Sequence, residues 1–366
     1  MAVISQKELI FDEERAYFQK FVTKNGDEYG LRFGAPDDAK AISVIFKEIY
    51  ENDYIYPLVY DTNLLKRELA DKNNFWFVGE SLDNKEIAGT GLIKKNRYIA
   101  HAGQAVVKKK YQGLGVTTKI GAAGIITCTK MPQFNDTLRL DSEVRGSKRI
   151  QKLIKDAGAL PYALIPAYLN YGDKRHFKVD DTNPFPASKE EAAFLYSIIF
   201  KKMWNIRENK IYLIDNEDLI FFHDYVKSHT KKMKNDELIF LKGKKDKGYE
   251  LYGVSKDYYD GIVNLYSYIQ EKSLNNLIET YRNWRIILWR IPATPNGVNS
   301  MALALEKGFN IVGYDIGFNN MNWTLNDSII MAYYPNGGSQ VLKMEYLDEN
   351  RPLYNKMREI YFSRID

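Results

Sequence analysis

The junction at residues 107–117 constrains this chain more than any other segment. It reads VKKKYQGLGVT, leaving a predicted strand at 98–107 and entering a predicted helix at 115–130. Gly113 and Gly115 allow a ligand to approach the backbone, and the start of the helix offers it N–H groups without intrahelical partners. The junction therefore predicts a phosphate or pyrophosphate site. An ordinary glycine turn between a strand and a helix is the alternative.

Two well-known phosphate loops do not fit this junction. A Walker A loop needs four residues between its glycines and then Gly-Lys-Ser/Thr. A dinucleotide-binding turn needs a third Gly or Ala where this chain has Thr118.

The first half of the chain alternates strands and helices around the junction. Periodicity and turn formers predict strands at 29–34, 74–81, 85–95, 98–107, 137–144, 159–169 and 192–200, and helices at 39–52, 62–72, 115–130 and 147–158. Thr62 is the expected N-cap of the second helix. Residues 170–190 lack periodicity and predict a long surface excursion.

The second half repeats much of this order. It predicts helices at 216–233, 273–283 and 298–308, and strands at 237–243, 249–255, 260–269, 284–293, 309–317 and 328–336. We expect a diverged internal duplication with domains at 1–205 and 206–366, joined within residues 201–213. One large mixed sheet is the rival interpretation.

The junction resembles the acyl-coenzyme A loop of the GNAT superfamily of N-acetyltransferases, whose pattern is Gln/Arg-x-x-Gly-x-Gly/Ala. Gln112 and Gly115 match its first and fourth positions, and Thr117 departs at the sixth. The resemblance implies an α/β fold of two GNAT-like domains, each a mixed, mostly antiparallel sheet flanked by helices. It also implies acetyl-coenzyme A, or another acyl-coenzyme A, as cosubstrate. The coenzyme contacts would come from Val107, Lys108, Lys109, Gln112, Gly113, Leu114, Gly115, Val116 and Thr117; for the lysines, a solvated run at a strand end is an equal alternative.

The same resemblance implies an acyltransferase that moves the acyl group from coenzyme A to an amine, which requires a base. His101, on the predicted strand 98–107, is one candidate, because its ordinary pKa is near neutral. Asp141 and Glu143, two residues apart on the next predicted strand, are the rivals. A structural histidine and solvated acids are the alternatives. Ile154 stands where the family often has a tyrosine acid, so the leaving thiolate would take its proton elsewhere or from water.

The second half lacks a Gly-x-Gly turn at the corresponding position, where the chain reads Gln270-Glu271-Lys272-Ser273. Glu271 would repel a pyrophosphate. We therefore expect a degenerate second domain and one coenzyme per chain.

Composition narrows the function classes. The chain has 366 residues, a formal net charge of +5 and a single cysteine, Cys128, which excludes an intrachain disulfide. Cys128 is expected to be a small core residue and no metal site is expected. We expect a cytoplasmic protein without a signal peptide or membrane span, because acidic residues and lysine interrupt the N-terminus and no apolar stretch is long enough.

The resemblance thus implies an acyltransferase, with acetyl as the expected acyl group, whose acceptor is an amine of a small molecule or peptide. The sequence leaves open whether the protein forms a homodimer, and its dispersed charge does not favour a nucleic-acid partner. Two alternatives remain: a non-catalytic acyl-coenzyme A sensor, and a tRNA-dependent aminoacyl transferase. The second would use the lysines at 227, 231, 232, 234, 242, 244, 245 and 247.

Overall fold

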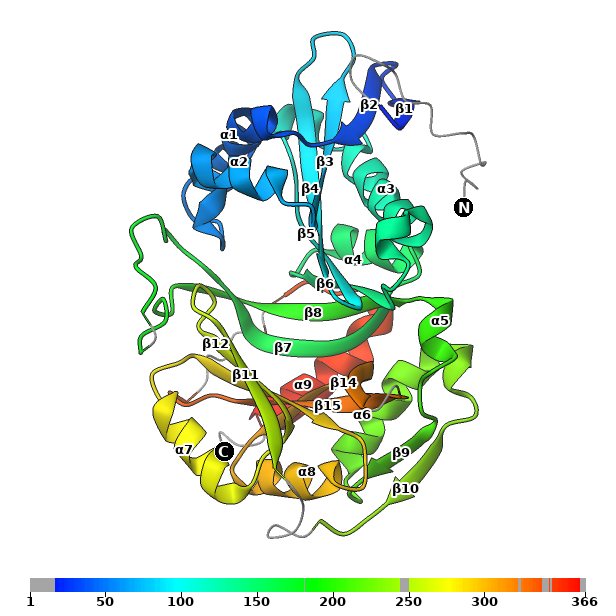
Figure 1. Ribbon diagram of the computed structural model, residues 1–366, viewed down its shortest axis with the longest axis vertical. Helices are drawn as coiled ribbons and strands as arrows, with labels where there is room; N and C mark the ends of the chain where they lie inside the picture. The colour runs from blue at the N-terminus through cyan, green and yellow to red at the C-terminus, as the bar shows by residue number, and fades with distance from the viewer. Residues whose placement is uncertain are drawn as a thin grey trace. The chain divides into compact units, whose positions relative to one another are not determined.

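The computed structural model describes residues 17–180, 182–243, 250–321, 324–337, 342 and 344–362. Its contacts divide the chain into two compact units, residues 1–141 and 142–366. Each unit contains a mixed α/β arrangement in which a mostly antiparallel sheet is flanked by helices, as the sequence predicts (Figure 1).

Unit 1 is built on a sheet with the strands in chain order. The strands are β1 (Gln19–Val22), β2 (Glu28–Phe33), β3 (Asn74–Ser81), β4 (Ile87–Asn96), β5 (Ile99–Val107) and the first half of β6 (Arg139–Val144). The helices are α1 (Ala39–Tyr50), α2 (Thr62–Ala70) and α3 (Val116–Lys130). The pairs from β1 to β5 are antiparallel, and β5 and β6 are parallel.

Both faces of this sheet are covered, because alternate residues of each strand point to opposite sides. Trp76 and Val78 of β3 lie in the core beneath α1 and α2. On the other face, a Cβ at Gly79 would lie 3.0 Å from Val116, and one at Gly91 would lie 2.9 Å from Ile120. These glycines let α3 approach closely, so its first turn is held directly against the sheet (Figure 1).

Unit 2 contains the rest of the chain. Its sheet has the order β6-β8-β7-β14-β15-β13-β12-β11, beginning with the second half of β6. The strands are β7 (Leu160–Tyr171), β8 (Lys189–Ile199), β11 (Leu251–Asp257), β12 (Ile262–Tyr268), β13 (Ile286–Pro292), β14 (Asn310–Met321) and β15 (Thr324–Tyr333), with β9 (Lys210–Leu213) and β10 (Glu237–Phe240) forming a separate parallel pair. The helices are α4 (Lys148–Asp156), α5 (Lys201–Trp204), α6 (Glu217–Ser228), α7 (Glu271–Thr280), α8 (Gly297–Glu306) and α9 (Arg351–Phe362).

Strands β7 and β14 join two distant parts of the chain within unit 2. Gly313 of β14 pairs with Ala163 of β7, and a Cβ on Gly313 would lie only 2.3 Å from the Ala163 Cβ. Because β7 and β8 belong to this sheet, the contacts divide the chain after residue 141. The domain boundary near residue 205, which the sequence predicts from an internal duplication, is a different division of the chain and stays a prediction.

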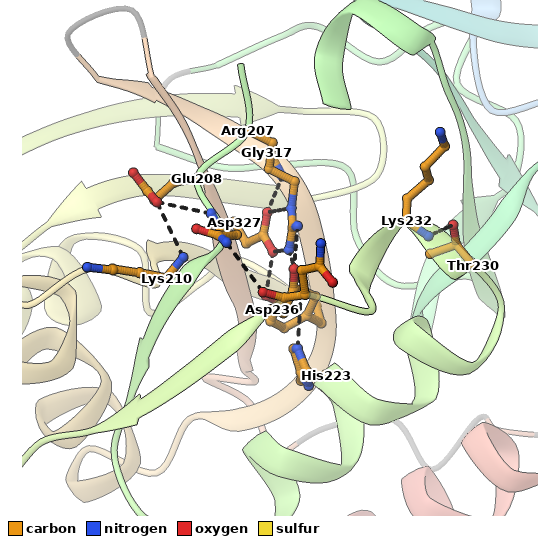
Figure 2. A network of polar contacts seen from close by, with 12 residues as sticks. Arg207, Glu208, Lys210, His223, Thr230, Lys232, Asp236, Gly317 and Asp327 are labelled. Carbon is orange, nitrogen blue, oxygen red and sulfur yellow. Dashed lines mark hydrogen bonds and ion pairs between the residues drawn. The ribbon is translucent and has the colours of Figure 1, made fainter. Parts of the chain in front are cut away.

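A buried polar cluster holds the start of the second half together. Arg207 donates from Nη1 and Nη2 to Asp236 at 2.8 and 2.7 Å, and from Nε to Asp327 at 2.7 Å (Figure 2). Nη2 also contacts Asp327, and the buried His223 lies against Asp236. Every nitrogen of this guanidinium therefore has a carboxylate partner.

Several details differ from the sequence expectations. Strands β1 and β9 and helices α5 and α9 were not predicted. The cap of α2 is Asp61, which accepts from the N–H groups of Asn63 and Leu64, and not Thr62. The excursion at 170–190 is anchored: Asn170 is fully buried and Lys174 is 1% exposed. Within the described residues, none of the helices has the length and hydropathy needed to span a membrane.

Candidate functional site

The junction after β5 has the geometry that its sequence predicts. Gly113 and Gly115 adopt left-handed φ angles of 84° and 90°, and the space where each Cβ would lie is empty to 4 Å. Gly115 is the N-cap of α3, whose N-terminus has no side-chain cap. The backbone N–H groups of the first turn are therefore available to an anion beside an open space.

Glu86 organises the approach to this junction. It accepts from Lys108 at 2.6 Å and from the Tyr111 hydroxyl at 2.7 Å, and it also pairs with Lys110. Hydrogen bonds from Lys108 and Lys110 lower the pKa of Glu86 to about 2. Lys109 is fixed through its backbone N–H, which donates to Glu48 at 2.7 Å. Glu86 thus shares the charges of Lys108 and Lys110, and the coenzyme role predicted for Lys108 and Lys109 remains a prediction.

The other predicted coenzyme residues divide by burial. Val107 and Val116 have buried side chains, so only their backbone can meet a ligand. Leu114 and Thr117 are half-buried, and the exposed Gln112 donates through its side-chain amide to the Val107 carbonyl at 3.2 Å. That these residues contact coenzyme A stays a prediction.

Strand β5 bends beside the junction. Two steps along β4, from Thr90 to Leu92, match three steps along β5, from Val106 to Gly103, which marks a β-bulge. Gln104 lies in this bulge with φ of 52°, and its buried side-chain oxygen has no hydrogen-bond partner among the described residues. Sequence reasoning missed Gln104, because a left-handed glutamine has no sequence signature.

Two of the three predicted base candidates come together. His101 of β5 pairs in register with Asp141 of β6, so both project from the same sheet face. Asp141 forms an ion pair with the buried Arg139, whose Nε donates to it at 2.6 Å. Glu143 belongs to unit 2, where the Tyr168 hydroxyl donates to it at 3.4 Å.

Other sequence candidates have structural positions. Cys128 is buried in α3, and burial raises the pKa of its thiol to about 12, which disfavours the thiolate. Ile154 lies on α4. The described residues contain no group of three or more side chains that could hold a metal ion.

The corresponding turn of the second half differs in chemistry. Glu271 begins α7 and pairs with Lys307 at 2.6 Å. A carboxylate thus occupies the first turn of the helix that follows β12. Of the lysines that a tRNA-dependent aminoacyl transferase would use, Lys244, Lys245 and Lys247 lie outside the described residues.

Comparison with known proteins found no matching family model and no matching curated protein. Among solved structures, a ribosomal-protein-alanine acetyltransferase from Vibrio fischeri is 16% identical, with a TM-score of 0.38, covering 50% of this chain and 97% of its own. A spermidine N-acetyltransferase from Vibrio cholerae is 14% identical, with a TM-score of 0.36, covering 47% and 93%. A putative acetyltransferase from Salmonella typhimurium, solved with acetyl-coenzyme A, is 13% identical, with a TM-score of 0.37 and the same coverage. Each of these three acetyltransferase structures aligns with about half of this chain and with nearly the whole of its own.

Proposed function

We propose that this protein is an N-acyltransferase that moves an acyl group, with acetyl as our first choice, from coenzyme A to the amine of a small molecule or peptide. The supporting observation is the junction itself. Two left-handed glycines precede the uncapped N-terminus of a 15-residue helix, with open space beside both glycines. This geometry suits a pyrophosphate, because several N–H groups and the helix dipole converge on one spot.

In the reaction, the neutral amine nitrogen attacks the thioester carbonyl carbon, and the carbon–sulfur bond breaks. The amine must lose a proton, and the departing thiolate must gain one. His101 is our candidate base. It projects from the same sheet face as Asp141, and we prefer it to Asp141 because the Asp141 carboxylate already pairs with Arg139. Asp141 and Glu143 remain the rival bases. With Ile154 on α4, the thiolate takes its proton from water or another residue.

A binding experiment tests the coenzyme site. Acetyl-coenzyme A at about 100 times its Kd should stabilise the native protein by about 2.7 kcal/mol. Gly115→Val should abolish this stabilisation, because a branched side chain cannot easily adopt its φ of 90° and would fill the ligand's space. Gly26→Val is the matched control: Gly26 also has a left-handed φ, of 88°, and empty space around its Cβ.

The two variants should lose comparable intrinsic stability, of about 1–2 kcal/mol, and only Gly115→Val should lose the ligand effect. Full acetyl-coenzyme A protection in Gly115→Val would remove the junction from the proposal.

A catalytic experiment tests the transfer. Release of free thiol from acetyl-coenzyme A in the presence of an amine panel, with mass detection of the acylated amine, would support it. Coenzyme binding without thiol release for any amine of the panel would instead favour a non-catalytic acyl-coenzyme A sensor. This alternative is worth testing because Ile154 stands where the family often has a tyrosine acid.

A further inference from the structure

Strand β11 ends the sheet of unit 2 and, among the described residues, pairs with β12 alone. Residues 251–255 are all exposed, so side chains on both faces of the strand meet solvent. Three of them are large and apolar: Leu251, Tyr252 and Val254 are 54%, 41% and 37% exposed. The outer edge of a strand with such side chains is a template for pairing with a further strand.

The usual devices that prevent edge pairing are missing from β11. The strand contains no proline, and its seven residues pair with β12 without a register shift, so no bulge twists the edge away. Its one basic residue is Lys256, whose ammonium lies 5.9 Å from the ring centre of Tyr258 and 5.6 Å from that of Tyr281. The strand therefore has little built into it that would oppose pairing.

The first half of the chain shows what occupies the equivalent edge. There, β4 lies next to β5, and β5 pairs in parallel with β6. In the second half, β11 lies next to β12, and β12 pairs in parallel with β13. The outer edge of β4 carries the antiparallel strand β3, whereas the part of unit 2 that the structure describes supplies no such strand for β11. This topology therefore favours an antiparallel strand as the occupant.

The sequence of β11, with the residue before it, is complementary to itself. Glu250, Tyr252, Val254 and Lys256 alternate along the chain, so they project from one face. If the strand pairs antiparallel with a second copy about Gly253, Glu250 lies opposite Lys256 of the copy, and Tyr252 lies opposite Val254 of the copy. Cross-strand pairs of opposite charge, and of an aromatic with a β-branched residue, are both stabilising. The segment thus matches a second copy of itself.

This pairing would also continue the core of the sheet. Val254 is in register with Leu265 of β12, and Lys256 is in register with Val263, and both β12 residues are fully buried. A second copy extends the apolar row from Leu265 through Val254 to Tyr252 of the copy. The exposed apolar surface of Tyr252 and Val254 is then removed from water in both chains.

We propose that β11 is a dimerisation edge whose occupant is β11 of a second copy of this chain, paired antiparallel about Gly253. Because a two-fold pairing uses the same edge of both chains, the assembly closes at two. The inference concerns unit 2 alone and does not depend on acyl transfer.

Sedimentation equilibrium of the full chain over a range of concentrations tests this proposal. The wild type should reach the mass of two chains and dissociate on dilution. Val254→Lys should stay at the mass of one chain, because an ammonium group would replace the apolar contact with Tyr252 of the copy. Val22→Lys is the matched control: Val22 is 61% exposed on β1, the strand at the other end of the strand order, and this variant should dimerise like the wild type.

A charge exchange tests the register and keeps the experiment decisive if Val254→Lys misfolds. Lys256→Glu should weaken dimerisation about tenfold, because two carboxylates would face each other across the strands. The double variant Glu250→Lys, Lys256→Glu should recover the dimer, and thermal melting of each variant reports on its fold. A wild type with the mass of one chain at every concentration, a dimer that responds equally to both valine variants, or no recovery in the double variant would overturn the proposal.

Discussion

Single residues of unit 1 combine structural and chemical roles around the β5–α3 junction. The left-handed backbone at Gly113 and Gly115 could be predicted from the sequence, because two glycines between a strand and a helix favour a turn that other residues adopt only with strain. The ion pair between Asp141 and Arg139 could not be predicted from the sequence, because it depends on which face of β6 is buried. The role of each ionisable group therefore needs kinetic and pH measurements.

His101→Ala should lower the acyl-transfer rate about 10² to 10⁴ fold near neutral pH and leave acetyl-coenzyme A protection intact. The reason is that the variant removes the proposed base but not the glycine junction. Thiol release at saturating coenzyme gives the rate, and His176→Ala, which changes an exposed histidine, is the control. A small loss in His101→Ala with a large one in Glu143→Gln or Asp141→Asn would transfer the role to that acid.

Glu86 should make the stability of unit 1 depend on acid pH. Hydrogen bonds from Lys108 and Lys110 lower its folded pKa from 4.5 to about 2. A depressed carboxyl pKa contributes stability above the unfolded value, and that contribution is lost as pH falls from about 4.5 towards 2. Glu86→Gln should therefore reduce Tm at neutral pH, and the difference from the wild type should shrink on acidification. A difference that stays constant with pH would show that charge is not the cause.

At the scale of elements, periodicity predicted most of the long helices and strands. Short β9 was missed because its four residues read as part of a charged joint. Helix α9 was missed although Leu353, Met357 and Ile360, all buried, have helical spacing that could have revealed it. The β-bulge at Gln104 depends on pairing with β4, so no local pattern predicts it.

The cap of α2 provides a test at this scale. Asp61→Ala should destabilise the protein by about 1 kcal/mol, because the N–H groups of Asn63 and Leu64 lose their acceptor. Thr62→Ala, at the neighbouring position where the sequence predicts the cap, should change stability much less. Urea unfolding of both variants measures the difference, and the reverse ranking would contradict the capping geometry.

At the scale of the whole molecule, the two halves share an element order and a parallel strand pair, β5–β6 in one and β12–β13 in the other. The sequence predicted the repeated order, but not the β7–β14 pairing. That pairing depends on a close approach at Gly313, which cannot be anticipated from hydrophobic pattern.

Calorimetric titration should find one acetyl-coenzyme A per chain. The first turn of α7 carries Glu271 paired with Lys307, where α3 offers uncapped N–H groups. Glu271→Gln should leave coenzyme affinity unchanged, whereas Gly115→Val should remove binding. Two equivalent sites per chain would contradict a degenerate second half.

The β7–β14 pairing also affects how the protein is made. Ala163 and Gly313 are about 150 residues apart, so β7 leaves the ribosome well before its partner strand exists. At about 5–20 residues per second, that edge stays unpaired for roughly 8–30 s during synthesis. An apolar strand with an open edge is a template for association with other chains. Nascent chains of this protein should therefore depend on a chaperone until β14 emerges, and slower translation should increase that dependence.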